Sequence, residues 1–500
     1  MIININKYCT PQNASIGVKQ AITDADSGDI ISFDKNEYHF YKDYSEHKVY
    51  HMTNTDSFKT PDKYFAILIE DKENITIDGN GSVFVIHGDM CALSLVRCKN
   101  IVLKNFTIRY NAPTNYEMTV KEKRGNAFIY SLPDGNNFEV RGRDIYFFER
   151  SPFTKKKYYE FRNKPKSYCN VLHNGDDVHR TQVSPVRAVL SMKRISNTEV
   201  RVKYLIPPAL NVGDTITMSH NRCRANCGLF FWECSNIVSE NITVNYMHGF
   251  GWLSQMCENL TFDKISFKPA DGYKVSSFAD CIHVCGCKGY VKINDCFFRD
   301  PHDDGINIHG AFLRLKRMVN EKTAVFEFVH NQQGGYKAFF KGDKVKFYDR
   351  RNLEELKGIY TVADSVDNIN EKTVELTFEE KLPDMTPKMF VIENITYNPE
   401  VTISNCTFRA IPTRGILCTT DKPSEIFSNR FIALKMPDIY ISCDCRDWYE
   451  SGPCKNMKIY NNTFSQKDPV VLDPLCMLKP VDNVHENIKI YDNKTEVIDE

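Results

Sequence analysis

The stretch CKNIVLKNFTI, residues 98–108, recurs in altered form along the chain. Further copies are CSNIVSENITV (234–244), CENLTFDKISF (257–267), CKGYVKINDCF (287–297) and CKNMKIYNNTF (454–464), with related segments at 74–86, 400–408 and 486–495. Each copy begins with Cys, Asn usually follows two residues later, and β-branched or aromatic residues then alternate with polar ones. Self-similarity of this kind indicates a repeat architecture.

The spacing of the copies fits one solenoid coil per repeat. Cys257 follows Cys234 by 23 residues and Cys287 follows Cys257 by 30, which suits short strands joined by tight corners. Because the alternation has a period of two, leucine-rich and helical repeats do not fit. A single coil cannot bury its inward face, so the coils must stack. We therefore predict an all-β parallel β-helix with inward ladders of apolar residues and Cys, and with Asn in the turns.

Near the start of the chain, Val18, Ala21, Ile22 and Ala25 have the i, i+3, i+4, i+7 spacing of a helix. Gly28-Asp29 and an apolar strand at 30–33 follow directly. We expect a short amphipathic helix that caps the open end of the solenoid.

Two stretches, 114–220 and 311–398, do not follow the coil frame. Both alternate as antiparallel strands, and both place Gly-Asp before a strand. We expect two small β-barrel or sandwich modules inserted between coils. The expected organisation is therefore a cap and first coils (1–113), a first inserted module (114–220), central coils with the catalytic carboxylates (221–310), a second inserted module (311–398) and C-terminal coils (399–500).

The composition of the chain excludes some classes of function. The 500 residues carry 64 Lys+Arg and 64 Asp+Glu, so the basic field of a nucleic-acid binder is missing. No run approaches 18 apolar residues and the opening MIININKYCTPQNAS lacks an apolar signal region. As written, the chain is expected to be soluble, off the membrane and cytoplasmic, although an exported chain trimmed of its signal would look the same. The 18 cysteines are expected to be mostly reduced and buried, and the oligomeric state stays open.

Successive coils align at their polar corners. FADCIHV (278–284) aligns with HDDGINI (302–308) at an offset of 24 residues, and TRGIL (413–417) aligns again beyond the second inserted stretch. In that frame Asp280, Asp304 and Arg414 share one column. The inward column two residues later fixes the register and holds Ile282, Ile306 and Ile416.

Alternation then sets which polar side chains face outward. Stacked coils lie ~4.8 Å apart, and Asp303 has the same parity as the outward row of its coil. One small patch is therefore expected to contain Asp280, Asp303 and Asp304 beside His283, Asn307 and His309.

Three carboxylates at this spacing repel one another, which raises at least one pKa unless a cation or a substrate compensates. Arg414, one coil further on, is the candidate cation. For a single DDG, a solvated Asp-rich turn is the better explanation, because Asp favours corners. The match over three coils, with two outward His and an Arg, favours a functional site.

Paired carboxylates on such a face suit glycoside hydrolysis, in which one acid protonates the leaving oxygen and another carboxylate activates water or attacks carbon. The residues alone do not assign the roles. A carboxyl separation of ~5–5.5 Å predicts retention of configuration, and ~6.5–9.5 Å predicts inversion.

Two loops are candidate walls of a sugar site. CDCRDWYESG (443–452) brings Trp448, Tyr449 and Glu450 just beyond the last site coil, and aromatic rings pack on sugar faces while carboxylates accept hydroxyl hydrogens. Trp448 as an ordinary core residue is nearly as good an interpretation. In MHGFGWLSQ (247–255), His248 or Trp252 is expected to form another wall.

A zinc site is disfavoured by geometry. Cys281, His283, Cys285 and Cys287 resemble a metal cluster, but ligands at every second residue of a strand span ~20 Å. Zn–S bonds of ~2.3 Å cannot collect them all. We expect neither a metal nor a cofactor.

At these residues the sequence resembles glycoside hydrolase family 110, the α-1,3-galactosidases built on a right-handed parallel β-helix. The likeness covers most of the chain, including two β-rich insertions. It is carried by ADCIHVCGCKGYVKINDCFF (279–298), DDGINIHG (303–310), TRGIL (413–417), WYESG (448–452) and the opening GDIISF (28–33).

The resemblance implies hydrolysis of terminal α-1,3-linked galactose with inversion and without a metal. The substrate would be an oligosaccharide with terminal α-galactose, either linear or fucosylated as in the blood-group B antigen. The resemblance further implies that Asp280, Asp303 and Asp304 are the essential carboxylates. Within the matching motifs, the expected sugar contacts are His283, Asn307, His309, Arg414 and Glu450, joined by Trp448 of the aromatic loop.

Other readings remain open. A polygalacturonase-like hydrolase would be expected to carry an Asn-Thr-Asp triplet and an Arg-Ile-Lys motif, and the site coils at 278–310 and 413–417 carry neither. A polysaccharide lyase would be expected to carry a calcium-binding cluster and a Lys or Arg that acts as the base. A non-catalytic carbohydrate-binding solenoid would bind sugar even after Asp303 or Asp304 is replaced by Asn.

Overall fold

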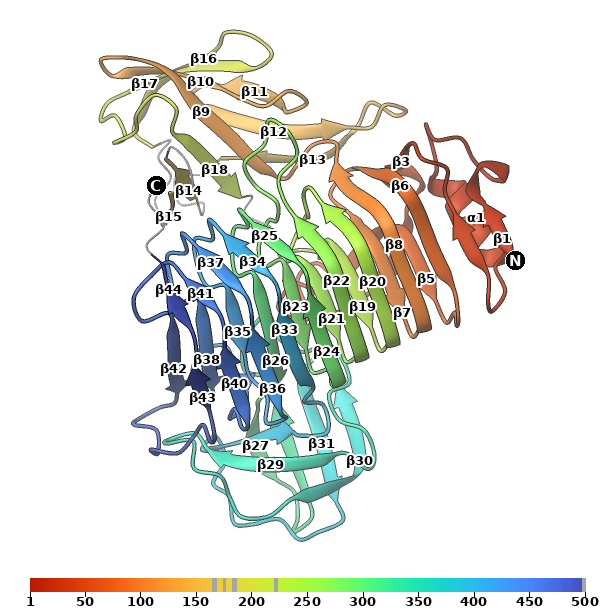
Figure 1. The fold of residues 1–500 in the computed structure, drawn as a ribbon, viewed down its shortest axis with the longest axis vertical. Coiled ribbons are helices and arrows are strands. Elements are labelled where there is room, and N and C mark those ends of the chain that lie inside the picture. The colour runs from red at the N-terminus through yellow and green to blue at the C-terminus, as the bar shows by residue number, and fades with distance from the viewer. Residues whose placement is uncertain (164–168, 174–176, 182–186, 220–223, 497–500) are drawn as a thin grey trace.

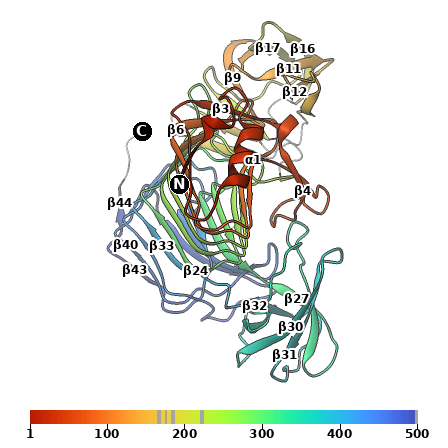
Figure 2. The same cartoon turned by 90° about the vertical axis from the view of Figure 1, so that its right-hand side faces the viewer.

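The computed structural model describes residues 1–163, 169–173, 177–181, 187–219 and 224–496. The chain folds as the predicted right-handed parallel β-helix, with coils stacked along its length (Figure 1). The helix α1 (Ser15–Asp24) lies at the N-terminal end of the stack (Figure 2) and buries Val18, Ala21 and Ile22 against it. The predicted cap is therefore present.

One large parallel sheet turns a corner on every coil. In the early coils a single strand spans the corner, as in β8 (Lys99–Tyr110), β20 (Ser235–Val244) and β22 (Glu258–Phe267). Later coils divide the same length into two strands, as in β24 (Lys288–Asn294) and β25 (Phe297–Arg299), or β33 (Glu400–Ser404) and β34 (Thr407–Arg409). The residues at these corners, such as Asn105 and Asn241, adopt positive φ, which Asn tolerates better than most side chains.

The Asn residues of the repeat form a ladder in the turns. Asn74, Asn100, Asn236 and Asn259 all have φ between 54° and 58°. The side-chain amides of Asn100, Asn236 and Asn259 each donate to the Asn of the preceding coil, at 2.8, 2.9 and 2.8 Å. The predicted placement of Asn in the turns is confirmed.

Inward side chains form the predicted apolar ladders. The clearest is a stack of buried Phe rings whose neighbouring centroids lie 4.8–5.4 Å apart, made by Phe267, Phe298, Phe408, Phe431 and Phe464. The repeat cysteines stack likewise, and among the described cysteines all are free and all but Cys9 are buried.

Replacing Phe298 with Ala is expected to destabilise the fold by about 3–5 kcal/mol, because it leaves a cavity between two stacked rings that cannot collapse. Chemical denaturation followed by circular dichroism measures the change. Tyr491, which stacks on Tyr460 but is 42% exposed, is the matched control, and Tyr491→Ala should cost less than about 1 kcal/mol. Equal losses in the two variants would contradict the ladder as the main source of stability.

Two antiparallel modules interrupt the coils. The first runs from β9 (Asn115–Arg124) to β18 (Thr215–Ser219) and contains a seven-stranded and a three-stranded sheet. The second is a closed six-stranded barrel from β27 (Leu313–Met318) to β32 (Phe390–Asn394). Figure 1 shows the first module above the solenoid and the barrel below it.

The site lies on the second parallel sheet of the solenoid. Its central strands, in stacking order, are β19 (Leu229–Trp232), β21 (Trp252–Gln255), β23 (Ile282–Cys285), β26 (Ile306–Ala311), β35 (Ile416–Cys418) and β38 (Ile439–Asp444). Among the described residues, no helix has the length and apolar character needed to cross a bilayer.

Candidate active site

The register of β23, β26 and β35 builds the site. Ile282 pairs with Ile306, and Ile306 with Ile416, as the sequence predicted. Two residues earlier, Asp280, Asp304 and Arg414 therefore meet at the start of three adjacent strands. Glycine permits this close stacking, because a Cβ on Gly305 would lie 2.7 Å from the carbonyl oxygen of Gly415.

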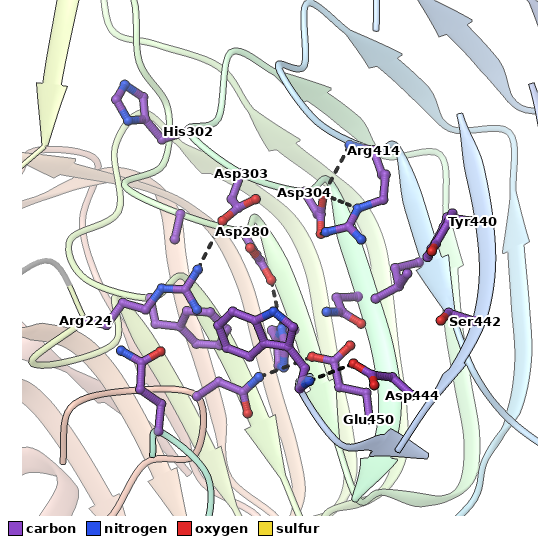
Figure 3. A pocket seen from close by; sticks show the side chains of 18 of the residues that line it. Arg224, Asp280, His302, Asp303, Asp304, Arg414, Tyr440, Ser442, Asp444 and Glu450 are labelled. Atoms are coloured by element: carbon purple, nitrogen blue, oxygen red, sulfur yellow. Dashed lines mark hydrogen bonds and ion pairs between the residues drawn. The ribbon is translucent and has the colours of Figure 1, made fainter. Parts of the chain in front are cut away.

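Arginines neutralise two of the three carboxylates (Figure 3). Asp304 accepts from the backbone N–H and Nε of Arg414 through Oδ1, at 3.1 and 3.0 Å, and from Nη2 through Oδ2 at 2.8 Å. Asp303 pairs with Arg180 at 3.4 Å and with Arg224 at 3.1 Å. The bidentate pair between Asp304 and Arg414 fixes the plane of the carboxylate as well as its charge.

Asp280 has no arginine partner of this kind among the described contacts. It is 3% exposed, and its Oδ2 lies 2.8 Å from Nδ1 of His283. Burial, together with the charges of Asp303 and Asp304, raises the pKa of Asp280 well above its usual value. Asp280 is therefore the member of the cluster that retains a proton most readily.

The pKa values of the other two carboxyls, Asp303 and Asp304, are shifted in opposite directions. Burial alone would raise the pKa of Asp303, but the guanidinium groups of Arg180, Arg224 and Arg414 outweigh burial and lower that pKa. For Asp304, burial and the charge of Asp303 outweigh Arg414, and the pKa is raised. Protonated and ionised carboxyls thus coexist in one cluster, which is the arrangement expected of a site for acid–base chemistry.

Among the residues that the structure describes, two groups of side chains have donor atoms close enough together for a metal ion. One is the Asp cluster, in which one oxygen from each carboxyl lies within 4.8 Å of the others. Its counter-charge is already supplied by the three arginines. The other consists of His173, Asp177 and His179, where Asp177 also pairs with Lys435. In both groups, neighbouring Arg or Lys side chains balance the negative charge, so charge balance does not require a metal ion.

A cavity of about 440 Å³ opens over the cluster. Eight of the nine predicted site residues line it: Asp280, Asp303, Asp304, His283, Asn307, Arg414, Trp448 and Glu450. The buried Oδ1 of Asn307 has no hydrogen-bond partner among the described residues, so it is free to accept from a ligand. His309 is not among the lining residues; it lies behind His283, with the two Nε2 atoms 2.8 Å apart.

The aromatic loop closes one side of the cavity. Asp444 accepts from the backbone N–H groups of Arg446, Asp447 and Trp448, which holds the loop in place. Trp448 is 36% exposed, and its ring lies between His330 of the barrel, at a centroid distance of 4.1 Å, and the Arg224 guanidinium, at 5.4 Å. Trp448 is therefore a surface of the cavity and not a core residue.

Comparisons with known proteins identify the family of this chain. Residues 323–388, within the barrel, match the family model described as GLAA-B beta-barrel domain II. The chain is 31% identical to alpha-1,3-galactosidase A of Streptomyces avermitilis, over 94% of this chain and 78% of that protein. The chain belongs to the α-1,3-galactosidase family, glycoside hydrolase family 110.

Further relatives of this family show similar coverage. Alpha-1,3-galactosidase A of Bacteroides thetaiotaomicron is 30% identical over 96% of this chain and 84% of that protein. Alpha-1,3-galactosidase B of Phocaeicola vulgatus is 28% identical over 87% of this chain and 74% of that protein. Among solved structures, the family 28 exopolygalacturonase of Yersinia enterocolitica matches with a TM-score of 0.42 and 9% identity, over 99% of this chain and 66% of that one.

In this α-1,3-galactosidase family member, one predicted wall was wrong. His248 is buried and bonds to the Thr114 hydroxyl at 2.7 Å. Trp252 is fully buried against Phe262, because it pairs with Ile282 and so takes the inward column. The residue between them, Phe250, lines the cavity instead.

The sequence also left several lining residues unassigned: Asn54, Arg180, Arg224, His302, Gln332, Tyr440, Ser442 and Asp444. Arg180 comes from the first module and Gln332 from the barrel, neither of which has a coil frame. Tyr440 and Ser442 did carry a signal, since Ile439 pairs with Ile416 and alternation then turns both of them outward.

Proposed function

We propose that the protein is an exo-acting glycoside hydrolase that releases terminal α-1,3-linked galactose with inversion. The observation that carries the proposal is the Asp280, Asp303 and Asp304 cluster at the base of a cavity, in a chain of the α-1,3-galactosidase family. The names of the relatives supply the linkage and the sugar.

The cavity walls support recognition of a neutral terminal sugar. Both inserted modules border the cavity, through Arg180 and Gln332, which favours a pocket over an open groove. Trp448 offers a ring face for the sugar, and Asn307 and Glu450 offer acceptors for its hydroxyls. We propose these three as sugar contacts, with His283 and Arg414 beside them.

The carboxyl cluster supports acid–base chemistry at the anomeric carbon. The reaction needs one carboxyl to protonate the leaving oxygen and another to take up the proton of the attacking water. One oxygen from each of the three carboxyls lies within 4.8 Å of the others, which is closer than the carboxyl separation typical of inverting enzymes with two carboxylates. Inversion is proposed from the likeness to glycoside hydrolase family 110, with two of the three carboxyls holding one water while the third serves the leaving group.

Acidic polysaccharides fit the cavity less well. All three arginines that line the cavity already pair with carboxylates of the site, two with Asp303 and one with Asp304. The carboxylate of a uronate would also face the acidic side chains of Asp444 and Glu450, which would repel it. No Lys of the described chain lines the cavity to act as the base of a lyase. An Asn-Thr-Asp triplet does occur, at 54–56, but of these residues only Asn54 reaches the cavity.

A panel of glycans tests this proposal. Galactose release is expected from Galα1-3Gal or its fucosylated blood-group B counterpart, at least about tenfold faster than from the α1-4 and α1-6 isomers, since a misplaced leaving oxygen loses the acid. Anion-exchange chromatography quantifies the sugar. Cleavage of polygalacturonate without release of galactose would contradict the assignment.

A further inference from the structure

His283 and His309 form a buried chain between two acidic residues of the site. Oδ2 of Asp280 lies 2.8 Å from Nδ1 of His283, and Nε2 of His283 lies 2.8 Å from Nε2 of His309. Nε2 of His309 also lies 3.4 Å from Oε1 of Glu450. Both imidazoles are at most 1% exposed, so water does not compete for these contacts.

The backbone fixes where the hydrogens of this chain reside. Nδ1 of His309 lies 2.6 Å from the carbonyl oxygen of Gly310, which can only accept, so this nitrogen carries a hydrogen. In neutral His309, Nε2 is then an acceptor and must receive the Nε2–H of His283. Nδ1 of neutral His283 is consequently bare, and the hydrogen between it and Asp280 belongs to the carboxyl.

A second arrangement has the same total charge. If the Asp280 proton moves to Nδ1 of His283 and the Nε2–H of His283 moves to His309, Asp280 becomes a carboxylate and His309 an imidazolium. The imidazolium then faces the Glu450 carboxylate. The two arrangements differ only in the position of two hydrogens along existing contacts of 2.8 Å.

We propose that His283 and His309 are positioning residues that relay a proton from Asp280 towards Glu450 during hydrolysis, an inference that rests on the proposed function. As the oxygen of the attacking water bonds to the anomeric carbon, its proton passes to Oδ1 of Asp280. The hydrogen on Oδ2 passes to His283, and the Nε2–H of His283 passes to His309. The glycosidic oxygen takes its proton from Asp304, whose pKa is raised by burial, while Asp303 stays ionised.

The charges around the chain favour the first arrangement at rest. Burial and the charges of Asp303, Asp304 and Glu450 raise the pKa of Asp280, and the opposing charge of Arg224 does not outweigh them. Burial, with His309 and Arg224, lowers the pKa of His283 well below its usual value. Asp280 therefore begins protonated, and a relay lets a protonated carboxyl accept a further proton without becoming cationic.

A buried histidine that plays no part in the site looks different. His248 is the example in this chain: it is buried, bonds to the Thr114 hydroxyl, and is not among the residues that line the cavity. The His283 and His309 pair instead connects two carboxyls that line the same cavity.

The variant His309→Gln tests the relay. The Gln carbonyl can still accept from His283, but it cannot take up a proton. We expect kcat to fall roughly 10–100-fold, less than for loss of a carboxyl itself, with KM unchanged because His309 does not line the cavity. Without the relay, Asp280 can accept the proton of the water only when it is ionised. Because its pKa is raised, the acidic limb of the pH profile of kcat should move to higher pH by about one unit.

His248→Gln is the matched control for placing Gln at a buried His, and it should leave kcat and the pH limbs as in the parent protein. Unchanged kcat in His309→Gln would overturn the relay. So would a loss of kcat that is equal at every pH, because that is the result of a structural defect.

A readout without turnover separates this inference from the proposed function. In protein labelled with ¹⁵N-histidine, assigned with His283→Gln and His309→Gln, the resting His283 should carry hydrogen on Nε2 and not on Nδ1. The opposite tautomer would overturn the relay even if galactose is released. If the parent protein releases no galactose, the proposed function fails, and the His283 tautomer alone decides whether the proton chain exists.

Discussion

Replacing Asp304 with Asn is expected to lower kcat/KM for an α-1,3-galactoside by about 10²–10⁴-fold, the range for removal of a group that takes part in proton transfer. Asn keeps the shape of the side chain, but it carries no charge and cannot exchange a proton with substrate or water. Steady-state release of galactose by the parent and the variant measures the effect. Asp280→Asn and Asp303→Asn are expected to fall in the same range.

Asp71 provides the control for the Asp304 variant. It holds Arg97 through the same bidentate contact, at 2.7 and 2.8 Å, but on the surface. Asp71→Asn should leave turnover unchanged. Normal turnover of Asp304→Asn would remove the cluster from the mechanism, and sugar binding without any turnover by the parent would indicate a carbohydrate-binding solenoid.

Replacing Arg414 with Gln is expected to destabilise the protein at pH 7 by about 3–5 kcal/mol, because it leaves the Asp304 carboxylate buried and uncompensated beside Asp303. Arg414 opposes the effect of burial on Asp304, so its loss raises the pKa of Asp304 further. A folded-state pKa above the unfolded value means that stability is retained at acid pH and lost as pH rises through the folded pKa. The penalty should therefore shrink below about pH 4 and grow towards neutrality.

Denaturant titrations at several pH values measure this dependence. Arg97→Gln, which breaks the exposed counterpart of the pair, should cost less than about 1 kcal/mol at every pH. Adding Asp304→Asn to Arg414→Gln should recover much of the lost stability, since no charge is then left unpaired. A penalty independent of pH would contradict the electrostatic account of this pair.

The coil register was predictable because the repeat carries it. Cys and Asn recur at fixed positions, since buried sulfur stacks at the corner and Asn tolerates positive φ in the turn. Once Ile282, Ile306 and Ile416 were aligned, the column of Asp280, Asp304 and Arg414 followed from the register between the coils. The same reasoning applied to Trp252, which lies 30 residues before Ile282, would have placed it inside.

Other parts of the site could not be predicted from the repeat, because they come from segments outside the coils or depend on contacts between distant segments. Arg180 reaches Asp303 from the first module, which has no coil frame, so nothing in the sequence relates the two residues. Parity placed His309 on the correct face of its strand but did not give its depth. The strand β39 (Glu450–Ser451) pairs with Gly310 and Ala311, and this non-local contact helps to bury the imidazole.

The anomer first formed from Galα1-3Gal tests the central claim most directly. Proton NMR of the parent protein with this disaccharide, read before mutarotation, distinguishes the two outcomes. An inverting α-galactosidase gives β-galactose first, and Asp304→Asn gives none over the same period. Initial α-galactose would show retention by this site, and no galactose from the linear or the fucosylated glycan would contradict the assigned function.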